Sequence, residues 1–297
     1  MKIGILSFGR PINREAEPPY EAKRLLNLAL TRGHESHVFC EPFFSFHENQ
    51  GQLEIFYDGS PLPQFDVFIT RSNLMEDPGL HLITLELLQS AGFKIINPII
   101  SANNKISRKV LLSQNNLPTP KFSIIRDPQV VKIEAEKIGF PLIIKTPNGS
   151  CGRGVFLAEN LPTVFPIVDY LTINQKIPVI LEEFIHEAQG KDIRAFVVGN
   201  RVVAAMEREA KIGDIRSNIH AGGTGHVVEL TDVEKKLAIQ AAQAINLQIA
   251  GVDIIRSNRG PLILEVNARP GFEGLEKATG IDVAAAIIEY AETLCKK

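Results

Sequence analysis

The sequence predicts an α/β fold followed by an α+β fold. Through residue 98, apolar strand patterns alternate with helical patterns, which is typical of an open, mainly parallel sheet. After residues 117–120, which read Leu-Pro-Thr-Pro, pairs of short strands are separated by longer helices. Each proline disfavours helix in the residue before it, so this segment is a natural linker. The 297 residues are enough for about two or three modest domains.

The N-terminal elements follow one another in a regular order. Strand patterns occupy residues 2–7, 36–40, 53–57, 66–70 and 94–97, and helical patterns occupy residues 15–32 and 79–91. The first strand leads into Ser7-Phe8-Gly9-Arg10-Pro11, which lacks the glycine fingerprint of a dinucleotide-binding loop. We therefore expect a Rossmann-like domain over residues 1–98 without the usual phosphate loop.

The rest of the chain divides into two predicted subdomains. Helices are predicted at residues 103–115, 129–138, 162–174, 232–245 and 282–295, and antiparallel strand pairs at 142–146 with 154–158 and at 193–199 with 201–206. We place a central subdomain at residues 99–185, which includes a glycine-rich loop. A C-terminal subdomain at residues 186–297 includes a predicted metal site.

A predicted hairpin gives the strongest chemical signal. Residues 252–256 and 262–266 are β-rich runs joined by a short polar segment. If Asn258-Arg259-Gly260 is a three-residue loop with Gly260 in the left-handed region, Asp253 faces Glu265 across the hairpin. A two-residue loop would send these two carboxylates to opposite faces of the sheet.

The same face of the hairpin continues to Asn267, two residues beyond Glu265. The opposite face is apolar and carries Val252, Ile254, Leu264 and Val266. Facing carboxylates repel, so they need a cation or a shared proton. All-oxygen ligation with few protein ligands suits magnesium or manganese completed by phosphate oxygens. The hairpin predicts such a site, the alternative being a solvated strand face.

A glycine-rich loop is the second candidate. Residues 147–154 connect two apolar strands, and Lys145 closes the first. Glycines let backbone amides approach phosphate oxygens, and a flanking lysine supplies positive charge. It is not a Walker loop, because the next element is a strand. A plain hairpin loop is the alternative. Lys105 is either a second phosphate ligand or a solvated helix lysine.

Other polar residues extend the candidate site. Arg216 is a candidate for neutralising phosphate, and Asn218 for a metal or phosphate shell, though both also fit an ordinary surface. Arg71 follows the strand at 66–70 and is either an acceptor-carboxylate ligand or a surface arginine. No Ser-His-Asp or Cys-His arrangement is evident, so nucleophilic hydrolysis is disfavoured.

Charge and composition narrow the classes of protein. A net charge of −2 gives no global field toward nucleic acid or an anionic membrane. The N-terminus lacks the pattern of a signal peptide, and no apolar stretch reaches the ~18 residues of a membrane span. Three widely spaced cysteines disfavour a disulfide framework or a zinc site. We expect a cytoplasmic protein without a nucleic-acid or membrane partner.

Taken together, these segments resemble the ATP-grasp ligases and, more closely, the RimK-like α-L-glutamate ligases. The resemblance lies in Lys105, Lys145, the glycine-rich loop, Glu182-Glu183-Phe184, Asp192, residues 187–194, Arg216-Ser217-Asn218 with Ile219-His220, Asp253, residues 258–262, Glu265-Val266-Asn267 and residues 276–282. It covers nearly the whole chain and is weakest through residue 98. It implies an ATP-grasp fold preceded by a Rossmann-like pre-ATP-grasp domain.

The resemblance also implies a role for each matching residue. It implies that Lys105 and Lys145 contact the ATP phosphates, that Glu183 and Phe184 make backbone contacts to adenine, with Glu182 as a one-position alternative, and that Asp192 contacts the ribose. Arg216, Ser217 and Asn218 are implied to contact the phosphate and the acyl phosphate. Two Mg²⁺ or Mn²⁺ ions are implied to bind Asp253, Glu265 and Asn267.

One position departs from the family pattern. RimK-like proteins usually read Asn-Ala-Ser-Pro-Gly where this chain reads Asn267-Ala268-Arg269-Pro270-Gly271. An arginine at this offset resembles more distant ATP-grasp enzymes. It either strengthens acyl-phosphate stabilisation, as a catalytic residue together with Arg216, or recognises a substrate carboxylate.

The implied reaction is formation of an amide bond through an acyl phosphate at the expense of ATP. The leading expectation is addition of L-glutamate to the C-terminus of a ribosomal protein or to a glutamate chain. The alternatives are ligation of an amino acid to a small carboxylate, such as an N-acetylated amino acid, a pterin or a deazaflavin coenzyme, and a degenerate nucleotide-binding regulator. The resemblance also implies a homo-oligomer, a tetramer.

Overall fold

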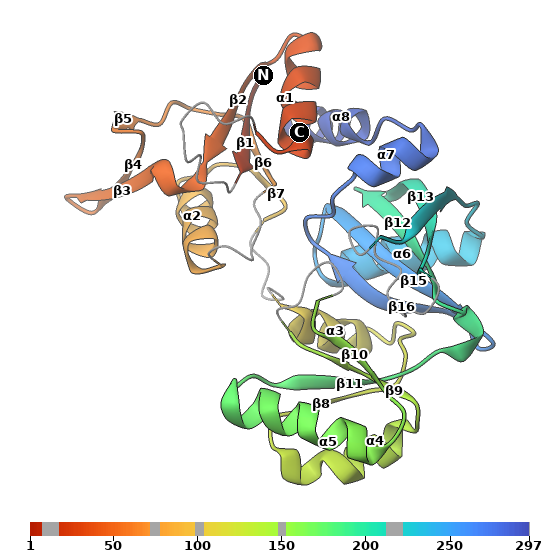
Figure 1. Ribbon diagram of the computed structural model, residues 1–297. Helices are drawn as coiled ribbons and strands as arrows, with labels where there is room; N and C mark the ends of the chain where they lie inside the picture. The colour runs from red at the N-terminus through yellow and green to blue at the C-terminus, as the bar shows by residue number, and fades with distance from the viewer. Residues whose placement is uncertain (8–17, 72–77, 99–103, 148–152, 212–221, 297) are drawn as a thin grey trace.

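The computed structural model describes residues 1–7, 18–71, 78–98, 104–147, 153–211 and 222–296. Within these ranges the chain forms three units, each built around a sheet of four or five strands (Figure 1). No helix in the described ranges is both long and apolar enough to cross a membrane.

The N-terminal unit is a parallel sheet with strand order β2-β1-β6-β7. All of its strand pairs are parallel, as the alternation of strands and helices predicted. Both faces of a parallel sheet are covered, so its strands are apolar throughout, and Ile3, Ile5 and Ile69 are fully buried. The elements are β1 (Lys2–Ser7), α1 (Tyr20–Thr31), β2 (Glu35–Cys40), β6 (Val67–Thr70), α2 (Pro78–Ser90) and β7 (Ile95–Ile96).

A small antiparallel sheet projects from this unit (Figure 1). It consists of β3 (Phe44–Asn49), β4 (Gln52–Tyr57) and β5 (Ser60–Pro61). The sequence predicted β4 but missed β3, whose second half is polar and exposed. Gln50 and Gly51 join β3 to β4 with φ angles of 52° and 83°, and positive φ at both positions is typical of a tight hairpin.

The central unit is an antiparallel sheet with order β10-β9-β11-β8 and helices packed against it. The predicted pairing of residues 142–146 with 154–158 is confirmed, with Lys145 opposite Val155. Its core is separate and includes Ile144, Val164 and Leu181. The elements are α3 (Lys105–Gln114), β8 (Phe122–Ile125), α4 (Val131–Ile138), β9 (Leu142–Lys145), β10 (Val155–Ala158), α5 (Leu161–Asp169), a π-helical turn at Tyr170–Asn174 and β11 (Val179–Glu183).

The C-terminal unit is an antiparallel sheet with order β14-β13-β12-β15-β16. One face packs on α6, whose Ala238, Ala241 and Ala242 are fully buried, because small side chains let the helix approach the sheet closely. The elements are β12 (Lys191–Val198), β13 (Arg201–Glu209), β14 (Thr224–Val227), α6 (Asp232–Ala244), β15 (Ile249–Ser257), β16 (Gly260–Asn267), α7 (Glu273–Thr279) and α8 (Val283–Cys295).

The hairpin of β15 and β16 corrects the predicted loop. Ser257 pairs with Gly260, so the loop has two residues and not three, although Gly260 has the positive φ expected of it (96°). A β-bulge at Leu264 then shifts the register by one residue, and Asp253 still pairs with Glu265. The expectation that a two-residue loop must separate these carboxylates was therefore wrong.

The bulge also changes which side chain enters the core. Ile263 is fully buried and packs with Val252 and Ile254 against α6. Leu264, which we expected on that apolar face, instead lines a pocket beside Glu265. One extra residue in a strand is enough to turn neighbouring side chains to the other face.

The N-terminal and C-terminal units share one hydrophobic core. Leu25 of α1 and Ile5 of β1 belong to the same buried cluster as Phe272, Ile287 and Ile288 near the C-terminus. Helices α1 and α8 lie side by side in Figure 1, and both ends of the chain lie near these two helices.

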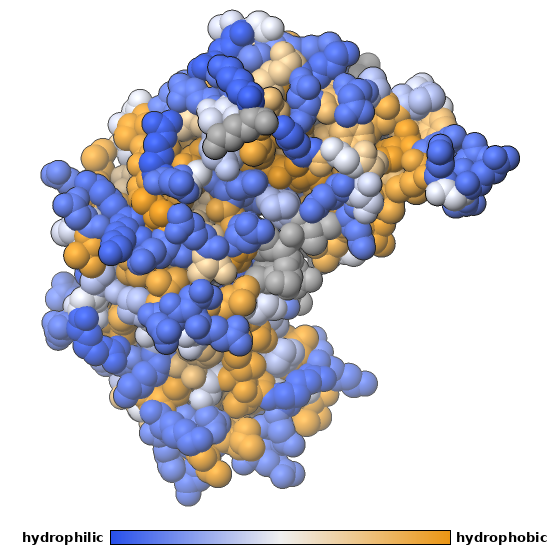
Figure 2. Space-filling view, turned by 180° about the vertical axis from the view of Figure 1, so that it is seen from behind, coloured by the Kyte–Doolittle hydropathy of each residue, from blue (hydrophilic) through white to orange (hydrophobic). Residues whose placement is uncertain are grey.

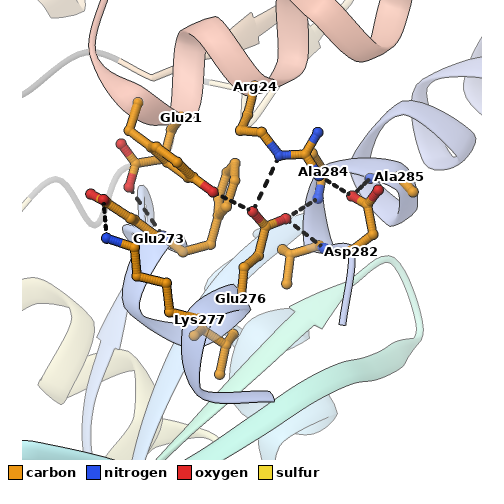
Figure 3. Close-up of polar contacts among 12 residues, drawn as sticks. Glu21, Arg24, Glu273, Glu276, Lys277, Asp282, Ala284 and Ala285 are labelled. Carbon is orange, nitrogen blue, oxygen red and sulfur yellow. Dashed lines mark hydrogen bonds and ion pairs between the residues drawn. The ribbon is translucent and has the colours of Figure 1, made fainter. Parts of the chain in front are cut away.

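Polar contacts reinforce this junction (Figure 3). One oxygen of Glu276 accepts from Tyr20 Oη (2.9 Å) and Arg24 Nε (3.4 Å). Its other oxygen accepts from the first two backbone N–H groups of α8, at 2.9 and 3.1 Å. Arg24 also pairs with Asp282, the N-cap of α8, at 2.9 Å. A single carboxylate thus stabilises a helix N-terminus and ties it to α1.

Asn97 forms a second junction between the units. Its Nδ2 donates to the carbonyl oxygens of Ile249 (2.7 Å) and Ala268 (2.6 Å). Its Oδ1 accepts from the backbone N–H groups of Gln248 and Ile249, both at 2.8 Å. The buried amide therefore uses all of its donors and acceptors.

Replacing Asn97 should destabilise the protein. Asn97→Ala removes four hydrogen bonds to buried or partly buried backbone groups, and we expect a loss of about 3 kcal/mol or more in the free energy of unfolding. Urea denaturation of the variant and the parent measures it. Asn49→Ala, at an exposed end of β3, is the control and should change stability by about 0.5 kcal/mol or less. Equal midpoints for both variants would contradict the role of Asn97.

Candidate active site

Charged side chains gather on the face of the C-terminal sheet opposite α6. Asp192 and Arg194 lie two residues apart on β12 and therefore point to the same side. Arg208 on β13 is opposite Asp192, and Asp253 on β15 is opposite Arg194. Four charged groups from three neighbouring strands thus meet on one face of the sheet.

Two arginines bind the two aspartates. Arg208 donates from Nε and Nη2 to the two oxygens of Asp192, at 2.7 and 2.5 Å. It also lies 3.0 Å from Asp253 Oδ2. Arg194 donates to both oxygens of Asp253, with Nη2 at 2.9 Å from Oδ2. Asp192, Asp253 and Arg208 are all buried, so these paired hydrogen bonds replace water.

The two aspartates experience different environments. Burial alone would raise the pKa of Asp253, but the charges of Arg194 and Arg208 outweigh it and bring the pKa to about 2. Burial raises the pKa of Asp192, and the charge of Arg208 offsets this only in part. Asp253 is therefore the more strongly ionised of the two.

Asp253 lies near the other two predicted metal ligands, Glu265 and Asn267. Glu265 pairs with Asp253 across the hairpin, and Asn267 Nδ2 lies 3.4 Å from Asp253 Oδ2. Within the described part of the chain, no three His, Cys, Asp or Glu side chains gather as a metal site. The predicted set has only two carboxylates and one amide, so it suits a hard cation whose other ligands are phosphate oxygens or water.

A small pocket between α3, the central sheet and β16 lies beside Glu265. Its charged lining is Lys105, Arg108, Lys109, Lys145, Glu182 and Glu265, and its apolar lining is Leu112, Ile180, Leu264 and Val266. In the space-filling view the molecule is hollowed between the projecting N-terminal arm and the lower, central unit (Figure 2). The pocket combines positive charge with partly enclosed walls, which suits an anionic ligand.

The lysines of this pocket have acidic partners. Glu182 is buried and pairs with both Lys109 and Lys145. Burial opposes ionisation of Glu182, but the two lysines outweigh it and lower its pKa. Lys105 Nζ lies 3.5 Å from Glu265 Oε2. The structure thus brings the predicted Lys105, Lys145 and Glu265 together.

Helix α3 explains the placement of two of these lysines. Asn104 caps the helix by accepting from the backbone N–H of Ser107 at 2.9 Å, so Lys105 is its first residue. Lys109 is four residues later and therefore points to the same side. Leu112 follows on that side and is buried in the core around α6, which fixes the helix against the C-terminal unit.

The predicted adenine residues lie at the end of β11. Glu182 points into the pocket, whereas Glu183, one residue later, points the other way and pairs with Arg259 Nη2 at 2.7 Å. The backbone N–H of Glu183 donates to Lys121 O at 2.9 Å. The ring of Phe184 contacts that of His186, with centroids 4.8 Å apart. Their contacts with adenine stay a prediction.

Some predicted residues lie outside the described ranges. These are Arg216, Ser217 and Asn218, and residues 148–152 of the glycine-rich loop. At the described end of that loop, Thr146 N donates to Gly154 O at 2.9 Å and closes the β9–β10 hairpin.

Two predicted arginines lie on the side of the site that faces the N-terminal unit. Arg269 follows β16, and its Nη1 contacts His81 of α2. Arg71 follows β6, and its Nη2 donates to Pro270 O at 2.7 Å. Neither is a solvated surface arginine, because both guanidinium groups contact other protein groups, and burial lowers the pKa of both.

Sequence reasoning missed several residues of the site. Lys109 and Arg194 had a usable signal, since Lys109 is one helical turn after Lys105 and Arg194 is two strand residues after Asp192. Glu182 was weighed only as the alternative to Glu183. Arg208 and His81 gave no local signal, because their partners come from other elements.

Comparisons with known proteins show the family of this chain. A family model described as the RimK-like ATP-grasp domain matches residues 102–291. A probable alpha-L-glutamate ligase of an Enterobacter species is 39% identical, with 98% of this chain and 96% of the relative covered. The chain belongs to the RimK-like ATP-grasp family. A ribosomal protein bS6–L-glutamate ligase of Escherichia coli is 38% identical over the same shares.

Solved ATP-grasp structures share the fold. The ligase PsnB, complexed with a phosphomimetic variant of its minimal precursor, Mg and ADP, superposes with a TM-score of 0.73 at 21% identity, covering 99% of this chain and 98% of PsnB. A RimK domain protein from Sphaerobacter thermophilus gives 0.72 at 17% identity, covering 98% and 99%. The predicted ATP-grasp fold is confirmed. So is the enzyme class of this RimK-like chain, a ligase that forms carbon–nitrogen bonds.

The arginine–aspartate network predicts a pH-dependent stability. Arg208→Met leaves Asp192 and Asp253 adjacent and undercompensated, which should cost about 3–5 kcal/mol at pH 7. The folded pKa of Asp253, about 2, lies below its ordinary value of 3.8. Its ion pairs therefore stabilise the fold fully at pH values above 3.8, and this stabilisation is lost as the pH falls toward 2. The difference in the free energy of unfolding between the parent and Arg208→Met should therefore become smaller between pH 7 and pH 3.

Urea unfolding of parent and variant at several pH values measures this. Arg201→Met is the matched control, because Arg201 is largely exposed and pairs with Glu289 at 3.2 Å. It should cost about 1 kcal/mol or less at every pH. A deficit of Arg208→Met that stays constant from pH 7 to pH 3 would argue against the network.

Proposed function

We propose that this chain is an ATP- and Mg²⁺-dependent ligase that adds L-glutamate to the C-terminus of a ribosomal protein or to a glutamate chain. The observation that carries the proposal is a pocket between two sheets that is lined by three lysines and Glu265. Glu265 pairs with Asp253 across the hairpin, and Asn267 Nδ2 lies 3.4 Å from Asp253 Oδ2. Support for the substrates comes from relatives named for ligation of L-glutamate to ribosomal protein bS6, such as that of Escherichia coli.

The phosphates of ATP are assigned to the lysine pocket. Lys105, Lys109 and Lys145 offer positive charge from α3 and β9, and Glu182 holds two of them in place. Ammonium groups fixed in a partly enclosed site neutralise phosphate charge without reorganising solvent. The proposal also includes adenine at Glu183 and Phe184, ribose near Asp192, and phosphate contacts from Arg216, Ser217 and Asn218.

Asp253, Glu265 and Asn267 are the residues that would hold Mg²⁺ or Mn²⁺, and we propose two ions. Their oxygens fit a hard cation. When bound, the metal neutralises the charge of the transferred phosphoryl group. Arg194 and Arg208 keep Asp253 ionised and oriented for this role. The related fold of PsnB was solved with Mg and ADP.

The proposed reaction has two displacements. A carboxylate oxygen of the acceptor attacks the γ-phosphorus of ATP, which breaks the bond to ADP and gives an acyl phosphate. The amine nitrogen of glutamate then attacks the acyl carbon, phosphate leaves and the nitrogen loses a proton. The chain contributes position and positive charge, with Arg216 assigned to the acyl-phosphate region. No side chain acts as a covalent nucleophile.

Arg269 favours one alternative acceptor. It departs from the serine usual in RimK-like proteins, so a small carboxylate such as an N-acetylated amino acid is the second candidate for the group that is activated. A degenerate regulator is disfavoured, because Asp253, Glu265 and Asn267 are together.

A substrate screen tests the proposed function. ADP release is measured with each of twenty amino acids, with and without ribosomal protein bS6, and the products are weighed by mass spectrometry. We expect release that depends on L-glutamate and bS6, with mass steps of one glutamyl residue. Any other increment would reject the glutamate assignment, and ATP binding without turnover would favour the regulator.

Asp253→Asn tests the metal site. It keeps the shape but removes a charged oxygen ligand, so ADP release should fall at least about 100-fold. Asp232→Asn is the control, because its carboxylate is fully exposed on α6. Normal turnover by Asp253→Asn would remove this residue from the metal site.

Lys145→Met tests the phosphate site. Removing one charge from the pocket should raise the KM for ATP about tenfold or more, since a hydrogen bond to a charged group contributes about 1.5–3 kcal/mol. Lys137→Met in the same unit is the control, because Lys137 is largely exposed. An ATP response unchanged from that of the parent would exclude Lys145.

A further inference from the structure

A buried line of three polar side chains joins the N-terminal unit to the end of β16. Glu41 follows β2 and His81 lies on α2, and both are fully buried. His81 Nδ1 is 2.7 and 2.8 Å from the two oxygens of Glu41. His81 Nε2 contacts Arg269 Nη1. The line therefore ends on the guanidinium that departs from the family pattern.

Hydrogen-bond chemistry fixes the proton in this line. A guanidinium can only donate, so His81 Nε2 must accept from Arg269. The single proton of the neutral imidazole is then on Nδ1, where it is donated to the carboxylate of Glu41. Burial lowers the pKa of His81, which favours this neutral form. A carboxylate and an imidazole thus orient one arginine.

A second guanidinium lies beside the first. Arg71 Nη2 donates to the carbonyl of Pro270, the residue after Arg269, and the Arg71 guanidinium lies 5.5 Å from the ring centre of Phe272. Burial, with smaller effects of the Arg71 and Arg108 charges, lowers the pKa of Arg269 to about 10. Two positive charges that influence each other become more favourable when an anion binds to both.

The arrangement of charged residues argues against the phosphate of ATP as this anion. Lys105, Lys109 and Lys145 already line a pocket that suits phosphate. Arg269 is four residues beyond Glu265 and faces α2 instead. The planar guanidinium fork matches a carboxylate. In the proposed reaction the acceptor carboxylate becomes an acyl phosphate, whereas the carboxylate of the amino acid is unchanged and needs a fixed partner.

We propose that Arg269 and Arg71 bind the free carboxylate of the amino acid that supplies the amine, and that Glu41 and His81 are positioning residues for Arg269. The inference rests on the proposed function, because it requires an amino acid as the nucleophile. It deepens that function by assigning the amine substrate to the junction of the N-terminal unit with the end of β16. The acyl phosphate would form on the lysine side, and the amine would approach from the arginine side.

Hydroxylamine provides the test, because it attacks an acyl phosphate to give a hydroxamate and phosphate but has no carboxylate. Initial rates are measured with bS6 as acceptor and either L-glutamate or hydroxylamine as nucleophile. The double variant Glu41→Leu/His81→Leu removes both buried polar partners together, which avoids leaving the Glu41 carboxylate unpaired. Arg269→Ser gives a second comparison that leaves the buried pair intact. Arg201→Ser, at an exposed arginine, is the control.

For the double variant and for Arg269→Ser, we expect kcat/KM for glutamate to fall about tenfold or more beyond any fall seen with hydroxylamine. The fall should come mainly from a higher KM for glutamate, because a hydrogen bond to a charged group is lost. His81→Gln, which retains an acceptor for Arg269, should recover part of the loss. Equal losses with both nucleophiles, no loss with either, or a rise confined to the KM for bS6 would overturn the proposal. If the parent forms no hydroxamate and releases no ADP, the proposed function itself fails.

Discussion

The pairing of two buried aspartates with two arginines is the interaction on which the site depends. Asp192 and Asp253 come from neighbouring strands of one sheet face, where unpaired carboxylates would repel and take up protons. Arg208 contacts both of them, and Arg194 adds a second fork to Asp253. Asp253 therefore stays ionised inside the protein. Glu265 and Asn267 on the next strand complete an oxygen-rich face beside the lysine pocket, so the proposed metal and phosphate positions follow from this one network.

The packing of the three units gives the site two different sides. The N-terminal and C-terminal units share a core and are tied by Glu276 and by the fully bonded Asn97. The central sheet has a core of its own and meets the C-terminal unit through α3, where Leu112 is buried. Lysines come from the second junction and Arg269 and Arg71 from the first. A ligase that handles an anionic nucleotide and an amino acid can use such a division, because each anion then has its own positively charged partners.

The hairpin of β15 and β16 shows how a correct pairing can follow from an incorrect loop. The sequence predicted Asp253 opposite Glu265 by assuming three loop residues. The loop has two, and the bulge at Leu264 supplies the missing residue further along the strand. A longer loop and a bulge both add one residue between the paired positions, so either gives the same register beyond the bulge. The spacing of the carboxylates along the chain determines only the total number of added residues and not where they lie. The prediction was therefore wrong for Leu264 and Ile263, because Ile263 faces the core and Leu264 faces the pocket.

The sequence by itself determined the order of the elements, the parallel and antiparallel sheets, and the residues whose chemistry lies within one strand, loop or helix. Alternation in β12 places Asp192 and Arg194 together, and helical spacing in α3 does the same for Lys105 and Lys109, because these periods are local properties of the backbone. Only the tertiary structure decided which charges meet across elements. Arg269 contacts His81 across 188 residues, and Asn97 contacts Ile249 across 152. Such contacts depend on how the units pack, and no period in the sequence records them.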